Sequence, residues 1–96
     1  MSLFVVKHQH PAEVCPAGDP QIGPMLSQHV SSTNAAQNGL NLHGEAVIDG
    51  GHTLYLIVEA PQKGTVDRFM APFSQMGSVE VLAASSCEAV VSRAHC

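Results

Sequence analysis

The sequence predicts an α+β domain with the element order strand, helix, two-stranded hairpin, helix, strand. Three observations support this prediction. An apolar, β-branched segment opens the chain at residues 3–7, and two apolar runs at 42–48 and 52–60 flank Asp49-Gly50-Gly51. Aspartate and glycine favour the positive φ angles of tight hairpin turns. Helical spacing appears on both sides of the hairpin, and 96 residues form a single domain, 1–96.

The first strand is expected to end before Pro11, because proline cannot donate to a β-ladder. Residues 11–18 are rich in proline and glycine and are expected to form a loop. Asp19-Pro20 has the pattern of an N-cap followed by a first-turn proline, and Gly23-Pro24 is the alternative start. The apolar side of this first helix is then formed by Ile22, Met25, Leu26, His29 and Val30.

A short turn is expected over residues 34–38, closed by Gly39. After the hairpin, Thr65 is the expected cap of a second helix, which Pro72 should kink and Gly77 should end. Residues 78–83 form the last predicted strand. A capping-box spacing from Ser85 to Glu88 then predicts a short C-terminal helix over about 86–94.

Both sides of the first and third strands are apolar. Phe4 and Val6 alternate with Leu3 and Val5, and the third strand repeats the pattern. A sheet covered by helices on one face normally has a polar second face, and only 12% of the residues are charged. We therefore expect a homodimer in which two sheets pack face to face. With its βαββαβ order, the chain resembles the dimeric α/β-barrel group of ferredoxin-like proteins, which form a four-stranded antiparallel sheet.

Composition argues against several classes of protein. The net charge is −4, and the four basic residues are scattered, so no stripe of cations could bind a nucleic-acid backbone. No apolar run is long enough to span a membrane, and the N-terminal residues are expected to form a strand rather than a secretory signal. Three cysteines, an odd number, favour reduced thiols and a cytoplasmic location over a disulfide framework.

Histidines and a cysteine converge on one edge of the predicted sheet. His8 and His10 lie two positions apart at the end of the first strand, so their rings project from one face, and Cys15 follows in a flexible loop. The first and third strands are expected to be antiparallel neighbours, which places His52 beside the two N-terminal histidines. The sequence therefore predicts a metal site made by His8, His10, Cys15 and His52.

Imidazole and thiolate ligands favour a transition metal over magnesium or calcium. Zinc is the first expectation, with nickel, copper or iron as alternatives. Three histidines and one thiolate would complete a tetrahedral zinc site, and replacing one by solvent would leave a catalytic type of site. Glu13 and Asp49 are close enough in sequence to act as a fifth ligand or to orient an imidazole.

Residues 8–16 and 52–60 are also similar to segments of small bacterial ferredoxin-like proteins that have no assigned activity. The resemblance implies that these histidines and Cys15 form the site of that family. It implies no reaction.

Two other functions remain open. One is a cofactor-independent oxygenase or isomerase-like enzyme that uses a histidine base in an apolar pocket lined by Phe4, Tyr55 and Phe73. The other is a non-catalytic dimeric module that binds a small molecule.

The remaining chemically active side chains are given structural interpretations. His29 is expected in the core or at a dimer contact, and His43 and Glu45 at an exposed edge or lining a barrel. A second metal clip formed by Cys87, His95 and Cys96 is the alternative to a frayed C-terminus.

Overall fold

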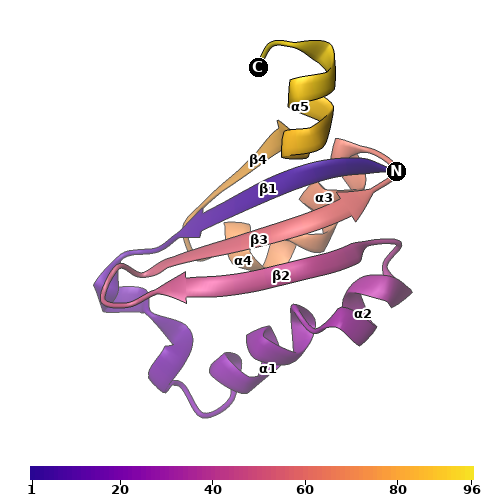
Figure 1. Cartoon of the computed structure of the whole chain (residues 1–96). Coiled ribbons are helices and arrows are strands. Elements are labelled where there is room, and N and C mark those ends of the chain that lie inside the picture. The colour runs from indigo at the N-terminus through magenta and orange to yellow at the C-terminus, as the bar shows by residue number, and fades with distance from the viewer.

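The computed structural model describes residues 1–96 and shows an α+β fold with one open, four-stranded antiparallel sheet (Figure 1). The strand order is β2-β3-β1-β4, with β1 and β3 in the centre. This order is compatible with the expected ferredoxin-like arrangement. The strands are β1 (Ser2–Gln9), β2 (Asn41–Ile48), β3 (Thr53–Ala60) and β4 (Ser78–Ala84).

Five α-helices and two 3-10 turns connect the strands. The segment expected to be a loop contains the two short turns, η1 and η2, in succession. None of the helices has the length and apolar character needed to cross a bilayer. The bounds are η1 (Ala12–Val14), η2 (Pro16–Gly18), α1 (Ile22–His29), α2 (Ser32–Gln37), α3 (Lys63–Phe69), α4 (Ala71–Ser74) and α5 (Cys87–Arg93).

Two helix boundaries differ from the predictions. Thr65 does not cap α3, which begins at Lys63 after Gln62. Pro72 does not kink one helix but separates two, because Met70 ends α3 and begins α4, where proline occupies one of the first positions. Backbone N–H groups have no intrahelical partner in a first turn, so proline loses nothing there.

The ends of two other helices are capped close to the expected positions. Asp19 Oδ1 accepts hydrogen bonds from the backbone N–H groups of Gln21 and Ile22, at 2.8 and 2.9 Å. At α5 the cap is Ser86, whose Oγ accepts from the Ala89 N–H at 3.1 Å. The N-cap is therefore Ser86 rather than Ser85, and because the third helical residue is Ala89 instead of Glu88, the expected capping box does not form.

The core lies between the helices and one face of the sheet. Burial alternates along β1 and β3, so every second side chain points toward the helices. The buried apolar residues are Phe4, Val6, Leu26, Val30, Ala35, Leu40, Leu54, Leu56, Val58, Ala60, Val66, Phe69, Met70 and Phe73.

The second face of the sheet is apolar and uncovered. Tyr55, Ile57 and Leu82 are 36%, 46% and 50% exposed, and Val5 lies between the last two in the strand register. Helix α5 extends from the end of β4 and buries none of its residues (Figure 1). The predicted alternation of apolar residues on both faces is confirmed, and nothing within one chain covers the second face.

The hairpin turn ends differently from the prediction. It occupies the four positions 49–52, and β3 starts at Thr53 rather than at His52. The positive φ angles belong to Gly50 (+72°) and His52 (+50°), and Asp49 does not have one. A histidine in the left-handed region is disfavoured by its Cβ. The backbone of His52, next to the start of β3, is thus in an energetically unfavourable conformation.

Candidate metal centre

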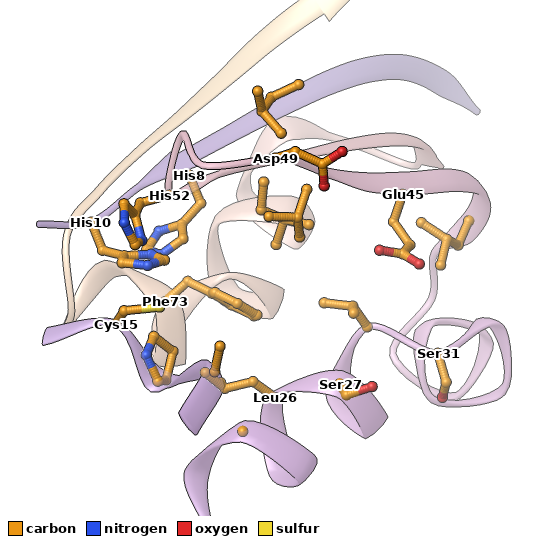
Figure 2. A pocket seen from close by; sticks show the side chains of 18 of the residues that line it. His8, His10, Cys15, Leu26, Ser27, Ser31, Glu45, Asp49, His52 and Phe73 are labelled. Atoms are coloured by element: carbon orange, nitrogen blue, oxygen red, sulfur yellow. The ribbon is translucent and has the colours of Figure 1, made fainter. Parts of the chain in front are cut away.

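Three of the four predicted ligands come together at one end of the sheet. The ligand atoms of His10, Cys15 and His52 all lie within 4.8 Å of one another. Tetrahedral zinc, with bonds of about 2.1–2.3 Å, would draw such atoms to separations of about 3.5 Å. Small side-chain rotations supply a movement of that size, so the residues fit the ion. Figure 2 shows the rings of His10 and His52 close together with Cys15 beneath them.

The strand register explains why two distant histidines meet. Gln9 pairs with Thr53 in the antiparallel β1–β3 ladder, so the next residue of β1 lies opposite the residue before β3. The backbone N–H of His10 donates to the carbonyl of His52 at 3.2 Å, and the ring centroids are 5.3 Å apart. The prediction that β3 begins beside the end of β1 is confirmed.

Cys15 reaches the histidines because the chain turns back between η1 and η2. Its N–H donates to the Ala12 carbonyl at 3.3 Å, which closes the first turn. The second turn is pressed against helix α1 at Gly23, where an added Cβ would lie 2.9 Å from the Pro16 carbonyl oxygen. A glycine at this position therefore allows the Cys15 loop to pack closely against α1.

His8 is not a member of the three-residue group but lies behind it. Its side chain is 2% exposed and packs edge-on against Phe73, with 5.1 Å between ring centroids. His8 Nδ1 lies 3.2 Å from the Ser78 carbonyl oxygen, and His10 Nδ1 lies 3.2 Å from His8 Nε2. Imidazole, imidazole and carbonyl thus form one chain of hydrogen bonds.

This chain assigns the tautomers. A carbonyl oxygen only accepts, so His8 Nδ1 carries the hydrogen and, in the neutral ring, Nε2 is an acceptor. His10 Nδ1 must then donate to His8 Nε2, which leaves the lone pair of His10 on Nε2. That nitrogen is buried and has no hydrogen-bond partner. Buried polar atoms are normally paired, and a metal ion is the partner that a bare imidazole nitrogen beside a thiol fits best.

Electrostatics favour the same neutral state. Burial lowers the pKa of His8, the neighbouring His10 lowers it further, and the Ser78 carbonyl partly opposes both effects. Burial also lowers the pKa of His10, with a second contribution from the positive charge that His52 carries when protonated. Both rings are thus held in the form that can bind a metal.

These lowered pKa values predict a pH-dependent stability for the metal-free protein. Above the ordinary histidine pKa of 6.5 both folded and unfolded chains are neutral at these positions. Below it, His8 and His10 are protonated in the unfolded chain but stay neutral in the folded chain. The free energy of unfolding should therefore fall as the pH drops from 6.5 toward the lowered pKa values. Urea unfolding at a series of pH values measures this. A flat profile across that window would contradict the assignment.

Gly77 packs closely against the backbone at the end of β1, next to His10. A Cβ at this position would collide with the Gln9 carbonyl oxygen and approach the His10 Cα to 2.9 Å. Gly77→Ala should therefore displace the strand end and destabilise the fold by about 1–3 kcal/mol. Gly18→Ala is the matched control, because an added Cβ there meets nothing within 4 Å. Equal unfolding midpoints for the two variants would refute this.

An open cleft of about 630 Å³ extends from the candidate centre between α1 and the β2–β3 hairpin. The histidines and Cys15 form one end, and Glu45 and Ser31 form the opposite end (Figure 2). Of the aromatic residues expected to line a pocket, only Phe73 does. Phe4 is in the core, and Tyr55 points to the uncovered face of the sheet, because its neighbours Leu54 and Leu56 face the helices.

The other histidines have structural partners. His29 Nε2 donates to the Phe69 carbonyl at 2.6 Å and its ring stacks on Phe69, so it joins α1 to α3. His43 lies on the exposed edge strand and contacts Glu59 at 2.6 Å, and this hydrogen bond is the main cause of the lowered pKa of Glu59. His29 is therefore a packing residue, and the edge-strand interpretation of His43 is confirmed.

Several candidates from the sequence lie outside the three-residue group. Asp49 lines the cleft, whereas Glu13 is exposed and does not. In the tail, Arg93 donates to the carbonyls of His95 and Cys96, and Cys87 is a free, exposed thiol. The Ser78 carbonyl that fixes the tautomers could not be predicted from the sequence, because every residue has a main-chain carbonyl whatever its side chain.

No protein-family model matches the chain, and no curated protein or solved structure does so either.

Proposed function

We propose that the protein binds one transition-metal ion, zinc in the first instance, through His10 Nε2, Cys15 Sγ and a ring nitrogen of His52. The observation that carries the proposal is the buried, unpartnered Nε2 of His10, a residue that belongs with Cys15 and His52 to a group whose ligand atoms lie within 4.8 Å of one another. His8 has a different role in this proposal: it fixes the ring of His10 through a hydrogen bond, as outer partners of metal-binding histidines commonly do.

Three protein ligands leave a coordination position free, and the cleft begins at these residues. Zinc sites of this composition act on small molecules as Lewis acids, whereas structural zinc sites have four protein ligands. We therefore favour metal-dependent binding of a small molecule over a purely structural zinc site. Nickel, copper and iron also accept imidazole and thiolate ligands, and they are the alternatives to zinc.

Metal analysis of protein purified without a histidine tag tests the proposal. One equivalent of metal per chain is expected, and after removal by a chelator one equivalent of zinc should bind again. His43→Asn and Cys87→Ser are suitable controls, because both residues are exposed and lie far from the site in the sheet or the tail. Protein that purifies without metal and fails to bind zinc would overturn the proposal.

A metal-free general base is the second candidate, because His10, which carries this lone pair, is one of the residues that line the cleft. That function needs His10 but not Cys15. If Cys15→Ser leaves small-molecule turnover intact while His10→Gln abolishes it, His10 acts as a general base without a metal. Loss of metal in both variants favours the metal site.

We also propose that two copies associate through the uncovered face of the sheet. The apolar side chains of Val5, Tyr55, Ile57 and Leu82 support this, since exposed apolar patches usually mark contacts. Lys7 and Glu80 are neighbours in the β1–β4 register, so each copy offers both charges at the rim of the contact. A two-fold axis can pair such charges across the interface.

Sedimentation velocity tests the association. The wild-type chain should sediment as a dimer, and Ile57→Asp should give monomers because a carboxylate would then be buried at the contact. Ile22→Asp is the control, since Ile22 is similarly exposed, at 39%, but lies on α1. A monomeric wild-type chain would refute this proposal and leave the metal proposal untouched.

A further inference from the structure

The cleft has a distinct chemical character at each end, and its charged lining is all of one sign. Its volume of about 630 Å³ is within the range of small-molecule sites. Glu45 and Asp49 are the only acidic residues that line it, and no lysine or arginine does. The carboxylates therefore meet a ligand without a protein cation between them.

The two carboxylates are also unpaired elsewhere. The chain has two ion pairs, His43 with Glu59 and Lys63 with Asp67, and neither involves Glu45 or Asp49. No side-chain hydrogen bond of the protein uses either carboxylate. Both carboxylates are therefore free to accept a hydrogen bond from a ligand.

The strand register directs Glu45 into the cleft. Glu45 pairs with Leu56 and Val47 with Leu54, and both leucines face the helix layer. Side chains directly opposite each other in a ladder share a face, so Glu45 and Val47 project on the same side. Figure 2 shows the Glu45 carboxylate turned toward the space between the hairpin and α1.

Between the two ends the lining is apolar. Leu26, Val30, Leu42, Val47, Leu54 and Phe73 all contribute to it. A ligand that fills the cleft therefore needs an apolar body. At the Glu45 end the Ser31 hydroxyl accepts from the Asn34 N–H and keeps its own hydrogen for a ligand.

We infer that the cleft binds a small primary amine with an apolar chain, its ammonium group at Glu45 and its other end at the metal centre. Binding of the ligand's other end to the metal rests on the proposed function. Binding of its ammonium group rests only on the charges and shape of the cleft, so either of the two contacts can be disproved without the other.

The first experiment uses the metal-free protein and three probes of equal length: hexylamine, hexanol and hexanoate. Methyl NMR signals of Leu42 and Val47 should shift with hexylamine, while those of Ile57, on the opposite face of the sheet, should not. Binding should be about tenfold weaker for hexanoate, because an exposed charge contact is worth about fivefold and the anion is repelled as well. Hexanoate binding as tightly as hexylamine would overturn the inference.

Variants assign the effect to the cleft. Glu45→Gln should weaken hexylamine binding about fivefold and leave hexanol unchanged. Glu80→Gln is the matched control, because Glu80 is exposed on β4 and does not line the cleft. Equal losses in both variants would show that net charge, rather than this site, attracts the amine, and would overturn the inference.

The second experiment uses the cobalt-loaded protein with aminohexanethiol, mercaptohexanol and mercaptohexanoate. Cys15 should already give the cobalt protein a sulfur-to-cobalt absorption band, and each thiol should increase that absorption. The amine should bind most tightly and the carboxylate least. If cobalt does not bind but hexylamine does, the proposed metal function fails and the ammonium site stands. If all three thiols bind cobalt with equal affinity, the ammonium site fails and the metal function stands.

Discussion

Replacing His52 by glycine should abolish tight zinc binding while making the metal-free protein more stable. The loss of a direct ligand should exceed the roughly 10- to 100-fold decrease in affinity that follows loss of an outer partner. His52 has a φ of +50°, and glycine adopts this conformation without a Cβ penalty. The free energy of unfolding should therefore rise by about 1 kcal/mol.

Zinc titration and urea unfolding of the same samples measure both effects. His52→Ala is the matched variant, because it removes the imidazole but keeps a Cβ, so it should lose zinc affinity without gaining stability. His43→Asn should change neither quantity, since His43 is an exposed residue of the edge strand. Unchanged zinc affinity in His52→Gly would exclude His52 as a ligand.

Replacing His8 should separate its role from that of a ligand. His8→Gln can place an amide oxygen near the position of Nε2, where it accepts from His10 Nδ1. His8→Asn can instead keep a donor for the Ser78 carbonyl but offers nothing to His10. Zinc affinity should fall about 10- to 100-fold in His8→Asn, and His8→Gln should recover much of it.

The pair of His8 variants also controls for misfolding, because both bury an amide in place of a ring. Calorimetric zinc titration with unfolding curves of the metal-free samples gives affinity and stability together. If both variants lose affinity equally, in proportion to their lost stability, His8 is only a packing residue. If neither loses affinity, the hydrogen bond to His10 has no part in metal binding.

Local signals in the sequence predicted most of the fold. The Asp49-Gly50-Gly51 turn, the alternation of Phe4 and Val6 with their neighbours, and the glycine at position 39 each depend on nearby residues, and the structure has a hairpin, two-sided strands and a positive φ at these places. The break at Pro72 was harder to predict. Whether proline kinks a helix or begins a new one depends on how Met70 and Phe73 pack in the core, which no local pattern contains.

The sequence predicted which residues lie near the site but not the role of each, because these roles depend on contacts between distant parts of the chain. Topology alone brought His10 and His52 together, because an antiparallel register fixes which strand ends meet. The position of His8 behind His10 depends on the start of β4, where the Ser78 carbonyl lies, and on the ring of Phe73. These contacts join residues about 70 positions apart. The sequence could therefore identify the histidines of the site, but it could not show which of them are ligands and which one orients a ligand.

Metal binding at this site requires that His10 present an unprotonated Nε2 to the ion, in an orientation fixed by His8. Long-range nitrogen–proton NMR of the histidine rings tests it most directly. Before zinc is added, His10 should be the tautomer with hydrogen on Nδ1, and one equivalent of zinc should shift Nε2 of His10 and a ring nitrogen of His52 but leave His43 and His95 unchanged. Hydrogen on His10 Nε2, or zinc shifts confined to His43 and His95, would show that His10 is not a metal ligand.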